Sequence, residues 1–100
     1  METPVLEMPD ILTYDDQESE KDLPWNVILY NDAHHTLQEV VFQVQKATGL
    51  SLEAAFEITM QVHTKGDAIC YTGTYIESKK VAIVLREIGL TVEVVHDTPL

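Results

Sequence analysis

The sequence predicts an α+β protein, a two-layer α/β sandwich in which a three-stranded sheet is covered on one face by three helices. Three runs are typical of strands because they carry β-branched and aromatic residues or alternate in polarity, and three longer segments repeat apolar residues at helical spacing. They follow one another in the order β-α-α-β-α-β. Two layers let the strands pair and let each helix bury its apolar stripe. The order of the strands within the sheet does not follow from the sequence.

Size and charge limit the classes of protein to which the chain can belong. One hundred residues with 45% hydrophobic content suffice for a single core. The net charge of -11 repels a phosphate backbone and an anionic membrane, so neither nucleic acid nor a membrane is an expected partner. The single cysteine, Cys70, excludes an internal disulfide and fits a reducing compartment. We therefore expect a cytoplasmic monomer without a membrane segment or signal peptide.

Most of the excess acid lies at the N-terminus. Residues 1–23 hold eight carboxylates and one lysine, and two prolines interrupt any regular structure. This composition predicts a disordered acidic arm over residues 1–23, before a core domain over residues 24–97 and a short tail over residues 98–100. The arm is either a solvated tail or a segment that docks on a partner through its scattered apolar residues.

The first strand and the first helix are separated by a polar turn. Residues 25–30 are apolar on both faces, which favours an interior strand, and residues 31–36 form the turn. Thr36 and Glu39 match a capping box, so the helix is expected over residues 37–48, with Gly49 ending it.

Ser51 is expected to cap a second helix over residues 52–65. Its stripe is apolar except at Thr59 and His63, which either are satisfied within the protein or are presented to a ligand. Lys65 complements the helix dipole, and Gly66 ends the helix.

The remaining elements alternate. We expect a strand over residues 67–71, a turn at Thr72 and Gly73, a helix that Thr74 begins and Gly89 ends, and a last strand over residues 90–95. Four polar residues of this third helix are expected to face water: Ser78, Lys79, Lys80 and Arg86.

Signatures of catalysis are absent from the sequence. It has no glycine-rich phosphate loop, nucleophile elbow or paired metal-ligand motif, so we do not expect an enzyme or a cofactor. His34, His35 and His63 are the available metal ligands, but adjacent histidines in a turn tend to diverge and the spacing is irregular. We therefore expect no metal site.

The polar turn and the second helix supply the parts of a receptor for an amine. An ammonium group offers three donors, and Asn31, Asp32 and His63 offer an amide oxygen, a carboxylate and an imidazole nitrogen to accept them. An apolar wall is expected from Leu37, Val40, Thr59 and Val62. Turn and capping chemistry alone also explains Asn31 and Asp32.

Three stretches carry a family resemblance: Val27-Ile28-Leu29-Tyr30-Asn31-Asp32, then the segment from Val62 to Cys70 (VHTKGDAIC), then Lys80-Val81-Ala82. They resemble the ClpS adaptor family of the Clp proteases, over about residues 24–95. The resemblance implies a small α/β sandwich that binds the N-terminal residue of N-end rule substrates and passes them to the AAA+ unfoldase ClpA or ClpC.

The resemblance also implies roles for single residues. Asn31, Asp32 and His63 would hold the substrate's α-amino group, and its large first side chain would meet a pocket formed by Leu37, Val40, Thr59, Val62 and Val92. Lys80 would face the N-terminal domain of the unfoldase, and the acidic arm would engage the unfoldase during delivery.

Three positions depart from the family pattern. Ala33 stands where a second acidic residue is common, and Thr59 stands where methionine is common, as does Leu37. Thr59 is smaller and brings a hydroxyl, so we expect a pocket that is roomier or partly polar there, with a shifted preference among Phe, Tyr, Trp and Leu. The alternative is an unfoldase-docking module that no longer recognises N-terminal residues.

Overall fold

The computed structural model describes residues 24–97, which form three strands and three helices. They are β1 (Trp25–Tyr30), α2 (Leu37–Thr48), α3 (Leu52–Lys65), β2 (Asp67–Gly73), α4 (Tyr75–Arg86) and β3 (Val92–His96). This order confirms the predicted β-α-α-β-α-β arrangement. The predicted acidic arm and the short tail lie outside the described residues.

The sheet places the first strand in its centre. Its strand order is β2-β1-β3, and β1 pairs antiparallel with both neighbours. The expectation that the apolar first strand is interior is therefore confirmed. The register between β1 and β2 shifts after Val27, which leaves Cys70 without a partner in β1 and turns it into the core. Burial raises the pKa of the Cys70 thiol to about 12, as suits an unreactive core residue.

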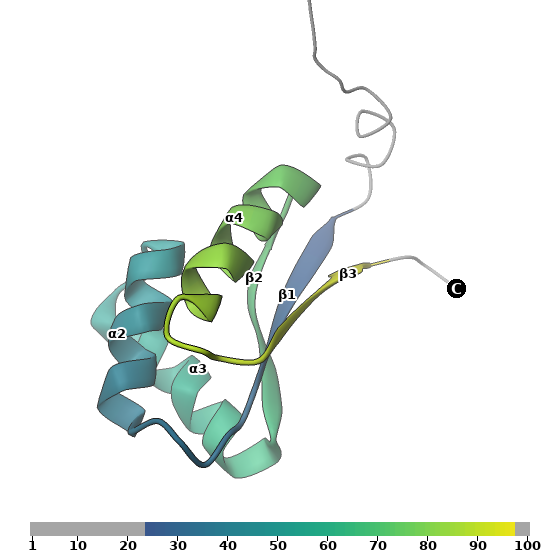
Figure 1. Cartoon of the computed structure of the whole chain (residues 1–100). Coiled ribbons are helices and arrows are strands. Elements are labelled where there is room, and N and C mark those ends of the chain that lie inside the picture. The colour runs from purple at the N-terminus through teal and green to yellow at the C-terminus, as the bar shows by residue number, and fades with distance from the viewer. Residues whose placement is uncertain (1–23, 98–100) are drawn as a thin grey trace, which may run out of the picture.

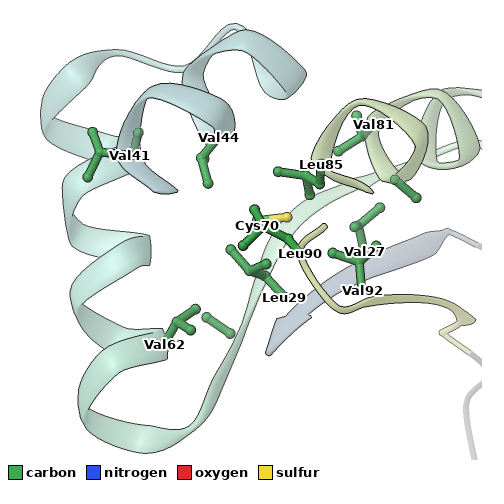
Figure 2. Packing of buried hydrophobic residues seen from close by; sticks show 13 residues of the cluster. Val27, Leu29, Val41, Val44, Val62, Cys70, Val81, Leu85, Leu90 and Val92 are labelled. Carbon is green, nitrogen blue, oxygen red and sulfur yellow. The ribbon is translucent and has the colours of Figure 1, made fainter. Parts of the chain in front are cut away.

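The three helices cover one face of the sheet (Figure 1). Val27 and Leu29 of β1 are fully buried beneath them, next to Val44 of α2 and Leu85 of α4 (Figure 2). Alternation along β1 sends these two side chains to the helices and leaves Ile28 on the opposite, open face. The sheet is therefore buried on one side only, as the two-layer prediction requires.

The helix starts agree with the sequence because their caps are local. The Thr36 hydroxyl accepts from the Glu39 amide, and the Glu39 carboxylate accepts from the Thr36 amide. Thr74 and Glu77 form the same box at α4, and Ser51 caps α3. The capping box at Thr36 fixes where the polar turn after β1 ends.

Two predicted boundaries near α4 were wrong. The chain does not turn at Thr72 and Gly73, because β2 continues through both and Gly73 pairs with Trp25. The helix ends at Arg86 instead of Gly89; Gly89 lies in the following turn with φ 86°, and its amide donates to the Arg86 carbonyl. The last strand consequently begins at Val92 and extends to His96.

The expectation that Ser78 faces water was also wrong. Ser78 is fully buried, and its hydroxyl donates to the Trp25 carbonyl across 3.2 Å. The first turns of α4 pack over the start of β1, so this position faces inward. Gln43 of α2 is likewise buried and donates to the Val84 carbonyl of α4 across 2.6 Å. These two polar contacts join α4 to β1 and to α2.

Candidate functional site

Three chain segments meet where β1 ends. The Asn31 amide donates to the Gly66 carbonyl at the end of α3 across 2.9 Å, and the Tyr30 amide donates to the Thr91 carbonyl before β3 across 3.0 Å. Figure 1 shows the ends of β1 and α3 side by side. The polar turn, the last turn of α3 and the segment that leads into β3 therefore form one junction.

A hollow of about 370 Å³ opens at this junction. The structure brings seven of the predicted site residues to its lining: Asn31, Asp32, His63, Leu37, Val40, Thr59 and Val62. Ala33, one of the positions that depart from the family pattern, also lines it, as do three residues that the sequence did not indicate for this pocket: Tyr30, His35 and Leu90. The hollow thus has polar acceptors from the turn and from α3, and aliphatic side chains from α2, α3 and the segment before β3.

The resemblance implies that Val92 lines the pocket, but Val92 is not among the residues that line this hollow. Val92 is 6% exposed and pairs with Leu29 in the sheet, on the face that the helices cover. Leu90 lines the hollow instead. The sequence predicts that the strand begins at residue 90; it begins at Val92, and Leu90 lies in the segment before β3 that borders the hollow.

Thr59 is satisfied within its own helix. The side chain is buried, and its hydroxyl donates to the Ala55 carbonyl across 2.8 Å. The donor is therefore used inside α3 and is not presented to the hollow. The sequence left two alternatives for the Thr59 hydroxyl, a hydrogen bond within the protein or presentation to a ligand, and the first is confirmed.

Asp32 is held by its own turn. One carboxylate oxygen accepts from the His34 amide across 2.8 Å and from the His35 amide across 3.1 Å, and the other lies 2.9 Å from Nδ1 of His35. Burial pushes the pKa of Asp32 upward, but these hydrogen bonds outweigh it and the pKa lies below its ordinary value. Asp32 is thus a fixed carboxylate at the rim of the hollow.

His35 connects this turn to a distant part of the chain. Its Nδ1 faces the Asp32 carboxylate, and its Nε2 lies 2.5 Å from the carbonyl of Ile88, 53 residues away. The hydrogen bond to Ile88 and then the bond and charge of Asp32 raise the pKa of His35, against the opposing effect of burial. The sequence offered no signal for this contact, because Ile88 contributes only a backbone oxygen.

The remaining predicted site residues lie on the surface. His63 is exposed in the last turn of α3, and Lys80 is exposed on α4. Within residues 24–97, no three side chains that could bind a metal ion come together. No helix of this part of the chain is long and apolar enough to cross a membrane.

The arrangement suits a cation that carries an apolar group. A carboxylate, an amide oxygen and an imidazole stand beside an aliphatic wall, and an ammonium ion can donate to each of the three. Aliphatic side chains offer such a cation no hydrogen-bond acceptors, so the wall suits its apolar part and not its ammonium group.

Residues 20–93 match the model of the family described as "ATP-dependent Clp protease adaptor protein ClpS". The chain belongs to the ClpS family. This confirms the resemblance and places the chain among adaptors of a protease, which are not enzymes themselves. Relatives named "ATP-dependent Clp protease adapter protein ClpS" include one from Corynebacterium jeikeium, 36% identical over 72 residues, and one from Streptomyces coelicolor, 31% identical over 71 residues.

These matches are partial in length. They cover 71% of this chain and 65% of the Corynebacterium jeikeium protein, and 71% of this chain and 74% of the Streptomyces coelicolor protein. For the relative from Corynebacterium glutamicum strain R, 36% identical, the match spans 55% of each chain. The chain thus spans about half to two thirds of the length of the Corynebacterium relatives.

A solved structure shares the fold. Agrobacterium tumefaciens ClpS2 bound to L-phenylalaninamide superposes with a TM-score of 0.70 at 16% identity, covering 75% of this chain and 98% of that chain. The predicted α+β fold of ClpS type is therefore confirmed.

Proposed function

We propose that the protein binds the N-terminal residue of substrate proteins in the hollow and delivers them to a ClpA/ClpC-type AAA+ unfoldase. The observation that carries this proposal is that Asn31, Asp32 and His63 line the same hollow as the aliphatic wall. Membership of a family of protease adaptors supports it.

Each part of the hollow has a role in this proposal. The α-amino group, when charged, donates to the Asp32 carboxylate and the Asn31 side-chain oxygen, and the third donor goes to His63. The first side chain packs against Leu37, Val40, Thr59 and Val62, with Leu90 in place of Val92. The Agrobacterium relative is bound to L-phenylalaninamide, which has a free α-amino group and a benzyl side chain, and this supports the same class of ligand here.

Delivery requires a second surface. Lys80 is exposed on α4, away from the hollow lining, and is proposed to contact the N-terminal domain of the unfoldase. The acidic arm over residues 1–23 is proposed to engage the unfoldase as well. We propose that the adaptor acts as a cytoplasmic monomer.

The alternative is a docking module without N-terminal recognition. Ala33 favours this alternative, because it lines the hollow and removes an acceptor from a position where an acidic residue would face the ligand. Binding of peptides separates the two functions.

The deciding experiment is fluorescence anisotropy with labelled peptides that differ only in their first residue. Peptides beginning with Leu, Phe, Tyr or Trp are expected to bind, and one beginning with Ala is not. Acetylation of the N-terminus and His63→Ala are each expected to abolish binding. His34→Ala is the matched control, because His34 is exposed in the same turn and is not among the residues that line the hollow. Folded protein that binds none of the peptides would contradict N-terminal recognition and favour the docking module instead.

A further inference from the structure

His35 lies between the polar turn and the connection that follows α4. Its two ring nitrogens face the Asp32 carboxylate and the Ile88 carbonyl, and both partners can only accept hydrogen bonds. A neutral imidazole has one N–H, so it can satisfy one of the two and would turn a lone pair towards the other. Only the imidazolium donates to both.

This contact is what ties the middle of the turn to the rest of the protein. The turn is bonded at one end by the Asn31 amide to Gly66, and at the other by the capping box of Thr36 and Glu39. Among the described residues, the bond from His35 to Ile88 is the one hydrogen bond that joins residues 32–35 to a segment outside the turn.

We infer that His35, as an imidazolium, is a positioning residue of the amine-binding turn, holding Asp32 at the rim of the hollow by bridging it to the Ile88 carbonyl. This inference rests on the proposed function for its effect on ligands. The bridge itself is a property of the protein without ligand.

The charged groups around the ring favour the imidazolium. Asp32 from the turn and Glu39 from the first turn of α2 both act on it, and the connection after α4 contributes the Ile88 carbonyl. From α3, His63 lines the same hollow. The two carboxylates outnumber any positive charge at the ring.

The positive ring also offsets the charge of Asp32, which opposes attraction of an ammonium ion. Water screens this effect, because the hollow is open at the surface. A carboxylate that moves away from the amine loses its hydrogen bond, since such bonds weaken steeply outside their narrow range of distance and angle. The positioning effect therefore outweighs the loss of attraction, and affinity follows the protonation of His35.

The test compares wild-type protein with His35→Gln, whose side chain cannot titrate and carries its N–H donors on a single nitrogen instead of on two separate ring nitrogens. The dissociation constant of a Phe-initiated peptide is measured from pH 5.5 to 9 for each. The ratio of the two constants cancels the titration of the peptide amine. At the acidic end we expect the dissociation constant of His35→Gln to be roughly ten times that of wild type, the size of a lost charge-assisted hydrogen bond. This ratio should fall towards one as wild-type His35 loses its proton.

Three results would decide against the inference. A ratio above one that does not change with pH would show a purely structural role. Tighter binding by His35→Gln than by wild type would show that charge outweighs position. The matched control, His34→Gln, is expected to give a ratio of one at every pH, and a pH-dependent ratio for this variant would mean that the effect does not belong to His35.

Nuclear magnetic resonance of the free protein separates this inference from the proposed function. We expect both ring nitrogens of His35 to carry protons at a pH near ~6.5, where an ordinary histidine is half neutral. The amide signals of His34 and His35, which donate to Asp32, should move with the same midpoint as the ring. If wild type binds no peptide, the receptor function fails, while these signals still decide whether the bridge exists. A neutral ring, or amides that do not follow it, overturns the inference.

Discussion

Thr59 sets the size of the hollow on the α3 side. Its hydroxyl is bound to the Ala55 carbonyl, so a short side chain with no free donor stands in the wall. The sequence leaves a roomier or a partly polar pocket open, and because the hydroxyl donor is already used we expect the roomier one. We expect space near Thr59 to favour bulky first residues over Leu.

Thr59→Met is expected to fill that space and reverse the preference. Overpacking typically costs about 1–3 kcal/mol, so peptides beginning with Trp or Tyr should lose more affinity than those beginning with Leu. Thr59→Val is the control, because it keeps the shape and removes only the hydroxyl. Anisotropy with the four peptides measures the change, and affinities of the methionine variant equal to those of wild type would remove the basis for a roomier wall.

The pair of Asp32 and His35 is expected to lower the free energy of unfolding both when pH falls and when pH rises. The pKa of Asp32 is lowered in the fold, so its contribution is present above its unfolded value of ~3.9 and is lost as pH falls through the folded one. The pKa of His35 is raised, so its contribution is full below ~6.5 and is lost as pH rises through the folded value. Urea denaturation should show the largest difference between wild type and His35→Gln between these limits. A difference that grows above neutral pH would contradict the assignment, and His34→Gln should show none.

At the scale of elements, local contacts were predictable and distant ones were not. The capping boxes at Thr36 and Thr74 lie within four residues and fixed both helix starts from the sequence. Ser78 was misplaced because its burial depends on Trp25, and His35 was missed as a site residue because its partner is the backbone of Ile88. The sequence predicts a turn at Gly73, but β2 continues through this residue. Only its pairing with β1, which the sequence does not show, reveals this.

Ser78→Ala tests the contact between α4 and β1. The Trp25 carbonyl would lose a buried donor, and such a loss lowers the free energy of unfolding by about 1 kcal/mol. Lys80→Ala, on the exposed face of the same helix, should stay within about 0.5 kcal/mol of wild type. Urea unfolding of the three proteins gives both values. Equal stability of Ser78→Ala and wild type would mean that the Trp25 carbonyl does not depend on this donor.

For the molecule as a whole, periodicity predicted the two layers, and strand order lay beyond it. Apolar residues on both faces of β1 indicated its interior place, but which strand pairs on each side depends on contacts between segments more than 35 residues apart in the sequence. The site followed the same division: most of the lining came from the turn and the helix faces, and Leu90 came from a connection whose geometry depends on where β3 begins.

Binding and delivery are expected to be separable because the surfaces proposed for them differ. The hollow lies at the ends of β1 and α3, whereas α4 carries Lys80 and extends towards the other end of the sheet (Figure 1). Lys80→Ala should therefore leave the affinity for a Phe-initiated peptide unchanged and slow degradation of a Phe-initiated reporter protein by a ClpC-type unfoldase with its peptidase. His63→Ala should abolish both.

Lys79→Ala is the matched control for delivery, since Lys79 precedes Lys80 and is also exposed on α4. Its Nζ lies 5.6 Å from the centroid of the Tyr75 ring. This variant should affect neither readout. If Lys80→Ala weakened peptide binding as much as it slowed degradation, the two surfaces would be coupled through α4. The Ile88 carbonyl that His35 binds lies in the connection after α4, so such coupling would act through the same turn. In the His35→Gln protein, Lys80→Ala would then no longer weaken peptide binding.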